Sequence, residues 1–273
     1  MGNMKSVFVT FGDANYRQSL LRIKAEAEQT GLFDCVRCYT PDDLPDTFNA
    51  YARRYKRGYG YWMWKPWIIR DALRDVGADG VVVYADAGCK VFAHSDWNRY
   101  FRIMEKKKGL FFIAPGKNRR WCKRAVPEFF HIANKFWQSA HQIQATFMIV
   151  RHNDVIERWC NLAEEHAELF IDVPEDQRHK ENPKFREHRH DQSVLTACVC
   201  TSADFSALQL MPEKLEYAYA GGQAVFGGRL ADAGSHAPVR HTKSKMETWM
   251  ERLLAPFVTF ETRMLYRLCS NRT

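Results

Sequence analysis

The sequence has no apolar run that approaches the ~20 residues needed to span a bilayer. Its start, MGNMKSVFVTFGD, lacks the apolar core and cleavage site of a signal peptide. Internal repeats, low-complexity tracts and a clear linker are also missing. These absences exclude a membrane-spanning chain, a collagen-like repeat and a coiled coil, and we expect a cytoplasmic protein with one main domain.

The composition allows a large core and a basic surface. Of 273 residues, 46% are hydrophobic and 14% aromatic, and the net charge is +8. A basic protein favours anionic partners, such as phosphates, nucleic acid or an anionic membrane surface. We expect the eight cysteines to be free thiols. A zinc site of Cys35 and Cys38 with Cys198 and Cys200 is a weaker alternative, because the second spacing is unusual.

Short apolar runs alternate with segments of helical periodicity. The predicted strands are 6–11, 33–39, 80–84, 110–114, 146–150 and 207–211, and the main predicted helices are 16–29, 67–76, 96–106, 154–169 and 191–200. This alternation predicts an α/β fold, a mainly parallel sheet with helices on both faces. We expect a main domain over 1–244 and an amphipathic helical appendage over 245–273.

Asp86 follows the most apolar predicted strand by two residues. Ligands of open α/β sheets bind beyond the carboxyl ends of the strands. A carboxylate there could hold a divalent cation against a diphosphate, and Gly88 would let the backbone approach a ligand. The alternative is that Asp86 only caps the next turn.

Five large rings surround Lys65 in the segment 58–67 (GYGYWMWKPW). Aromatic faces stack on bases and sugars, and Lys65 could contact a phosphate. The alternative is an aromatic core cluster along which the Lys65 stem reaches water. We favour a mixed role.

Two polar segments could supply further chemistry. Asp191 lies at the start of a predicted helix, where it could act as a general base or simply cap the helix. The neighbouring His188, Arg189 and His190 fit an anion site or a solvated loop. Later in the chain, a basic segment could bind a metal or a diphosphate through Arg240, His241, Lys243 and Lys245.

Together these segments resemble bacterial and viral glycosyltransferases of the GT-A fold, which use nucleotide sugars in polysaccharide synthesis. The resemblance covers about residues 5–245. It rests on the order of VTFG (9–12), RIKAEA (22–27), GYGYWMWKP (58–66), YADAGC (84–89), DQS (191–193) and the late His241.

The resemblance implies a donor site for a nucleoside-diphosphate sugar. Its residues would be Thr10, Phe11 and Gly12 at the base, with Arg22, Lys65, Tyr84, Asp86 and Gly88 near the nucleotide and phosphates. Asp86 and His241 would hold Mn²⁺ or Mg²⁺. The chain departs from a full Asp-x-Asp motif, because positions 84 and 88 are Tyr and Gly. Without a metal, basic residues would neutralise the leaving diphosphate instead.

The resemblance also implies the remaining roles. Asp191 would be the catalytic base of an inverting hexosyltransferase; in a retaining enzyme it would position sugar hydroxyls. Sugar and acceptor contacts would come from Trp62, Trp64, His190 and Gln192, and diphosphate contacts from Arg240, Lys243 and Lys245. The acceptor would be a glycan or a lipid-linked acceptor.

Apolar and charged residues alternate over 245–273. Such a helix could lie on an anionic membrane at the cytoplasmic face, although packing against the main domain is slightly favoured. Two rival functions remain: a basic nucleic-acid-binding protein, and an inactive scaffold that binds a sugar nucleotide. No known nucleic-acid motif is present, so we do not expect nucleic acid as a partner.

Overall fold

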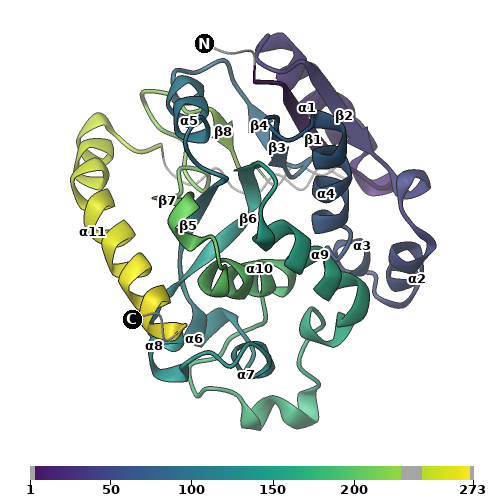
Figure 1. Ribbon diagram of the computed structural model, residues 1–273, viewed down its shortest axis with the longest axis vertical. Helices are drawn as coiled ribbons and strands as arrows, with labels where there is room; N and C mark the ends of the chain where they lie inside the picture. The colour runs from purple at the N-terminus through teal and green to yellow at the C-terminus, as the bar shows by residue number, and fades with distance from the viewer. Residues whose placement is uncertain (1–3, 229–241, 271–273) are drawn as a thin grey trace.

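A six-stranded sheet forms the centre of the computed structural model, which describes residues 4–228 and 242–270. The strand order is β2-β1-β3-β6-β5-β7 (Figure 1). The strands are β1 (Ser6–Phe11), β2 (Cys35–Tyr39), β3 (Val81–Ala85), β5 (Gly109–Lys117), β6 (His141–Val150) and β7 (Leu208–Pro212). β1 pairs in parallel with β2 and β3, and β5 with β7. β6 runs antiparallel between β3 and β5, so the predicted mainly parallel sheet is confirmed with one reversed strand.

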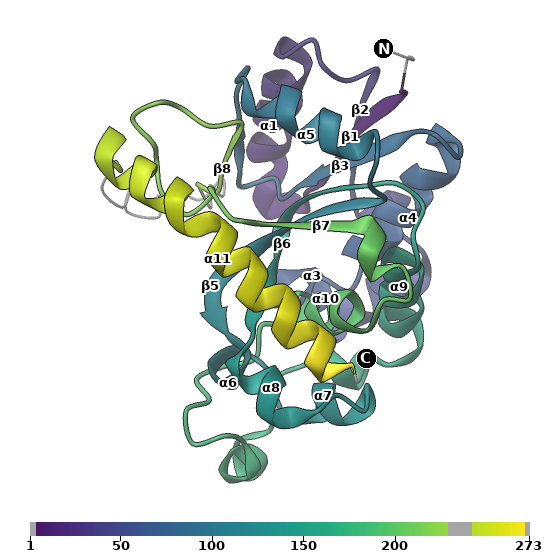
Figure 2. The same cartoon turned by 60° about the vertical axis from the view of Figure 1, so that its left-hand side comes forward.

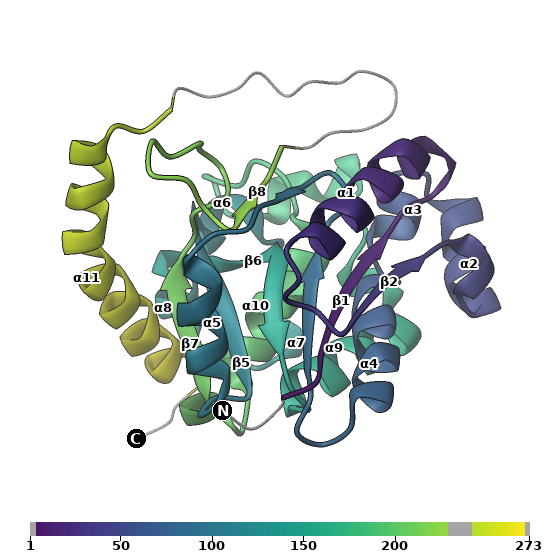
Figure 3. The same ribbon diagram turned by 90° about the horizontal axis from the view of Figure 1, so that it is seen from above.

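Helices cover both faces of this sheet, as the sequence predicts (Figures 1 and 3). The alternation of side chains along β3 decides which face each residue meets. Val82 and Tyr84 face the core beneath α4, α9 and α10, whereas Val81 and Val83 face the core beneath α1 and α5. These helices span Lys65–Val76 (α4), Asp154–Glu165 (α9), His190–Thr201 (α10), Arg17–Gln29 (α1) and Asp96–Met104 (α5).

Shorter elements fill the connections. A small second sheet pairs β4 (Lys90–Val91) with β8 (Val225–Phe226). The short helices are α2 (Asp46–Arg54), α3 (Gly58–Tyr61), α6 (Asn118–Trp121), α7 (Ala125–Phe129) and α8 (Asn134–Ser139). Most of these went unpredicted, because helices of four to six residues are too short to show a periodic pattern.

The C-terminal segment forms one helix, α11 (Lys245–Cys269). It begins with a capping box between Ser244 and Glu247 and crosses one side of the molecule beside β7 and α8 (Figure 2). Within the described ranges, no helix is both long and apolar enough to cross a membrane.

The eight cysteines are free. Cys35 and Cys38 lie on edge strand β2, and Cys198 and Cys200 are buried in α10. In residues 4–228 and 242–270, no three His, Cys, Asp or Glu side chains come together as a metal-binding group, so the alternative zinc site does not form there.

Candidate functional site

A cavity of about 700 Å³ opens at the carboxyl ends of the parallel strands β1 and β3. This is the position that an open α/β sheet offers to a ligand. The cavity collects most of the predicted site residues, namely Phe11, Gly12, Trp62, Trp64, Lys65, Tyr84, Asp86, Gly88, His190, Asp191 and Gln192. They come from four separate segments, so the fold assembles them.

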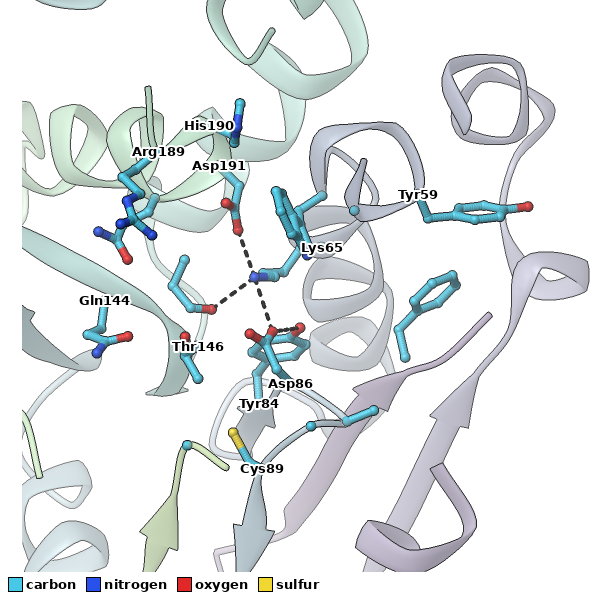
Figure 4. Close-up of a pocket in the computed structure, with 18 of the residues that line it drawn as sticks. Tyr59, Lys65, Tyr84, Asp86, Cys89, Gln144, Thr146, Arg189, His190 and Asp191 are labelled. Atoms are coloured by element: carbon cyan, nitrogen blue, oxygen red, sulfur yellow. Dashed lines mark hydrogen bonds and ion pairs between the residues drawn. The ribbon is translucent and has the colours of Figure 1, made fainter. Parts of the chain in front are cut away.

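Lys65 forms the centre of the cavity floor (Figure 4). Its ammonium lies 2.7 Å from Asp191 Oδ2 and 3.1 Å from Asp86 Oδ1. It also donates a hydrogen bond of 3.1 Å to the carbonyl of Ala145 on β6. Lys65 is the first residue of α4, Asp86 follows β3, and Asp191 lies in the first turn of α10. Through these contacts, Lys65 links α4 to β3, β6 and α10 beneath the cavity.

Burial and charge set the ionisation of this group. Burial of Lys65 opposes its charge, but the two carboxylates outweigh burial and raise its pKa. Burial also raises the pKa of Asp191, against the opposing effect of Lys65. The side chain of Asp86 is 33% exposed, whereas that of Asp191 is 8% exposed. Asp86 is thus the carboxylate more open to a ligand, and Asp191 is the buried carboxylate beside it.

Tyr84 and Arg22 hold the Asp86 loop from two sides. The fully buried Tyr84 hydroxyl donates a 2.5 Å hydrogen bond to Asp86 Oδ1. Arg22 donates to the carbonyls of Ala87 at 2.9 Å and Cys89 at 2.8 Å. Arg22 is not part of the cavity lining, and its guanidinium supports the loop from outside the cavity.

Thr10, another predicted donor residue, is fully buried within β1 and also lies outside the lining. Its neighbours Phe11 and Gly12 do line the cavity. Phe11 stacks on Trp64, with the ring centroids 4.0 Å apart. Trp64 in turn donates its indole N–H to the carbonyl of Gly58. Its side chain is buried, so it forms part of the cavity wall and is fixed there by this hydrogen bond.

The aromatic segment before α4 has a left-handed backbone. Residues 58–62 all have positive φ, between 51° and 84°. The amides of Tyr61 and Trp62 donate to the carbonyls of Arg57 and Gly58, which closes one left-handed turn. Left-handed residues with side chains are unfavourable by about 1–2 kcal/mol each. Strain of this kind is concentrated at ligand sites, and this turn presents Trp62 to the cavity.

His190 is a neutral, buried part of the wall. Burial lowers its pKa to about 4. Nδ1 lies 2.7 Å from the Phe170 carbonyl, and the ring lies against those of Tyr61 and Trp62, with centroids 4.5 and 5.6 Å apart. Burial also lowers the pKa of His188 well below its usual value. Both rings are buried, so the alternative of a solvated loop does not hold for these two histidines.

The amide of Gln192 borders the cavity beside Asp191. It donates a 2.6 Å hydrogen bond to Gln142, whose own amide reaches Ser193. This network fixes the first turn of α10 and with it the direction of the Asp191 carboxylate.

The predicted diphosphate residues that the structure describes, Lys243 and Lys245, do not line the cavity. Arg240 and His241 lie outside the described residues. Lys243 pairs with Glu251 and faces the rings of Tyr217 and Tyr219, and Lys245 begins α11; neither lines the cavity.

Other cations line the cavity, and among them the sequence indicates only Arg189 as part of an anion site. They are Lys56, Arg57, Arg120 and Arg189. Arg57 pairs weakly with Asp172 and Glu187, and Arg189 pairs with Glu187. Lys56 and Arg120 form no ion pair with any residue in the described part of the chain. Lys56 and Arg120 belong to basic runs at 53–57 and 117–121, and these runs are the sequence feature that could have identified them as cations of the site.

The described residues do not fit a divalent-metal centre. Asp86 Oδ1 already accepts the Tyr84 hydroxyl and faces Lys65. A divalent metal ion needs several oxygen ligands. The Lys65 ammonium lies 3.1 Å from Asp86 Oδ1 and would repel a metal ion bound to that oxygen. The second predicted ligand, His241, lies outside the described residues.

No protein-family model and no curated protein sequence matches the chain. Among solved structures it is similar to a glycosyltransferase involved in glycosylation of the major capsid of PBCV-1, at 11% identity over 79% of this chain and 85% of that one, with a TM-score of 0.42. It is also similar to an active-site mutant of LgtC, at 12% identity over 78% and 75%, with a TM-score of 0.43. Mouse xyloside xylosyltransferase 1 aligns at 9% identity over 78% and 87%, with a TM-score of 0.38.

Proposed function

We propose that the chain is a glycosyltransferase that takes a sugar from a nucleoside diphosphate and passes it to a hydroxyl of a glycan or lipid-linked acceptor. The observation that carries this proposal is the ion-paired group of Asp86, Lys65 and Asp191 on the floor of a cavity with aromatic walls and cations in its lining. Rings suit the flat faces of a base and a sugar, and the cations suit a diphosphate.

The donor would lie across the ends of β1 and β3. Phe11 and Gly12 would border the base, and Asp86 would accept hydrogen bonds from sugar or ribose hydroxyls. Lys56 and Arg120 are free to meet the diphosphate, whose negative charge grows as it leaves. Arg240 and His241 lie outside the described residues. A contact of Arg240 with the diphosphate and of His241 with a metal remain predictions from the sequence.

Asp191 would be the general base. The acceptor oxygen forms a bond to the anomeric carbon while the bond from that carbon to the diphosphate oxygen breaks. The electron pair leaves with the diphosphate, and the acceptor proton passes to Asp191. Its raised pKa makes this carboxylate a better proton acceptor than an exposed one. A direct displacement of this kind would invert the configuration at the anomeric carbon.

A donor screen tests the function. The melting temperature of the chain is measured with nucleoside diphosphates and sugar nucleotides, with and without Mn²⁺ or Mg²⁺. A ligand that binds only the folded state raises it by mass action. We expect one nucleotide family to stabilise the chain. If none does at millimolar concentration, the proposal fails.

Asp191→Asn separates an enzyme from an inactive binding protein. The variant should keep the donor-induced shift but lose slow donor hydrolysis and transfer by at least about a hundredfold. Wild type that binds donor without turnover on any acceptor or on water supports the scaffold alternative. The anomeric proton coupling of the product, read by NMR, decides between inversion and retention.

A further inference from the structure

The outer face of α11 is the largest exposed apolar feature among the described side chains. Along it runs an apolar stripe, which we define as Met246, Met250, Leu253, Phe257, Phe260 and Met264. Their spacing of three or four residues places all six along one line of the helix. Phe257 is 72% exposed and Phe260 69%. A contiguous apolar surface of this kind marks an interaction site.

The opposite face of α11 holds the helix to the domain, mainly near its end. The buried residues of the helix are Thr262, Tyr266 and Cys269. The Tyr266 hydroxyl donates to the His141 carbonyl at 2.6 Å, and the Cys269 carbonyl accepts from the Ala133 amide at 3.1 Å. No residue from 245 to 261 is buried, and this part extends along the side of the molecule (Figure 2). The stripe is therefore a free face of an anchored helix.

Charges are divided between the two edges of the stripe. Because an α-helix turns about 100° per residue, Lys245, Arg252 and Arg267 project along one edge. All three are exposed and form no ion pair with another described residue.

The acids of α11 lie on the other edge and are already engaged. Glu251 pairs with Lys243, Glu261 pairs with Lys117, and Glu247 completes the capping box. The open charge beside the apolar stripe is consequently positive.

We propose that the apolar stripe of α11 docks on an anionic lipid surface, with the helix lying in the plane of the interface. An interfacial helix of this kind has an apolar face in the acyl boundary and cations at the headgroups. Trp249, 56% exposed at one margin of the stripe, adds a ring of the type that favours this boundary. A second copy of the chain is the less suitable occupant, because two molecules of net charge +8 repel while an anionic surface attracts each. The proposal is independent of the cavity chemistry.

Flotation of the full chain with vesicles tests this docking. We expect binding to vesicles that contain phosphatidylglycerol and much weaker binding to pure phosphatidylcholine. The double variant Phe257→Asp/Phe260→Asp should bind roughly a hundredfold more weakly, because burial of each ring contributes about tenfold. Leu21→Asp is the matched control: it removes a 57% exposed apolar side chain on α1 and should bind as wild type does.

A second variant probes the charged edge. Lys245→Gln/Arg252→Gln/Arg267→Gln should lose the preference for phosphatidylglycerol and keep its melting temperature, since none of the three is buried. Wild type that does not float, or a Phe257→Asp/Phe260→Asp variant that floats like wild type, overturns the proposal. A dimer of the wild type that the same double variant abolishes, without vesicle binding, assigns the stripe to a second copy.

Discussion

Lys65 reaches Asp191 across 2.7 Å, although 125 residues separate them in the chain. The pair links the first residue of α4 to the first turn of α10, and both helices pack on the same face of the sheet. Side-chain exposure is 3% for Lys65 and 8% for Asp191. Each of these two buried charges is therefore neutralised by the other. The more exposed Asp86 carboxylate lies beside them and faces the cavity.

Replacing Lys65 by Met should destabilise the fold by about 3–5 kcal/mol, because it leaves a buried carboxylate without its counter-ion. The loss should shrink as the pH falls. Without Lys65 the folded-state pKa of Asp191 rises further above its unfolded value, so the folded variant binds the extra proton, and stability is regained toward low pH. Urea unfolding from pH 8 to pH 5 measures both effects.

Lys108→Met is the control for that experiment. Lys108 pairs with Asp204 at 2.6 Å, but the two side chains are 50% and 41% exposed. Water screens such a pair, and its loss should cost less than about 1 kcal/mol at any pH. Equal losses in the two variants would contradict the central role given to the Lys65 pair.

The sequence predicts the sheet well because its strands are continuous apolar runs. The segment 80–84 lies within two residues of β3, and 6–11 coincides with β1. The placement of Asp86 at the cavity follows from its position after β3. The ion pairs of Lys65 with two carboxylates could not be predicted. They depend on the tertiary packing of α10 near the start of α4, two elements that are far apart in the sequence.

The same limit explains the misplaced cations. Basic residues are common in this sequence, and only the tertiary fold separates Lys56 and Arg120, which line the cavity, from Lys243 and Lys245, which do not. The left-handed turn was hidden for a different reason. Gly58 and Gly60 permit it, but Tyr59, Tyr61 and Trp62 adopt it against their local preference, which only packing can impose.

Gly58→Ala should destabilise the protein more than an ordinary left-handed glycine replacement. At Gly58, φ is +57° and an added Cβ would lie 2.4 Å from atoms of the Trp62 ring. Gly31 supplies the matched control, with φ +64° and nothing within 4 Å of an added Cβ. We expect about 1 kcal/mol for Gly31→Ala, from backbone strain alone, and at least about twice that for Gly58→Ala. Urea unfolding gives both values, and tryptophan fluorescence should change only in Gly58→Ala.

His190 should make the fold sensitive to acid. Its folded-state pKa of about 4 lies below the ordinary value of 6.5, so the unfolded chain binds a proton that the folded chain refuses. This stabilisation is present above pH 6.5 and is lost as the pH falls toward 4, by up to about 3 kcal/mol. His188, also buried, steepens the same loss. Unfolding free energies measured at intervals across this window should fall with acidification.

The contribution of His190 is isolated by His190→Asn, since asparagine tolerates the positive φ of 39° found there. The variant should show a shallower pH slope than wild type. His131→Asn, at an exposed position with φ 52°, controls for the backbone conformation and should leave the slope unchanged. A slope that His190→Asn does not alter would mean that the ring stays accessible to protons in the folded state.

The cations of the cavity should govern the affinity for a nucleoside diphosphate. Arg120→Ala and Lys56→Ala each remove a charge that lines the cavity, and we expect each to weaken binding by about tenfold, the effect of one charge-assisted hydrogen bond. Lys245→Ala is the matched comparison, because Lys245 is an exposed cation at the start of α11 and lies outside the cavity lining. Calorimetric titration with the diphosphate that the donor screen selects gives the three affinities. A large loss in Lys245→Ala with none in Arg120→Ala would instead favour the diphosphate site first inferred from the sequence.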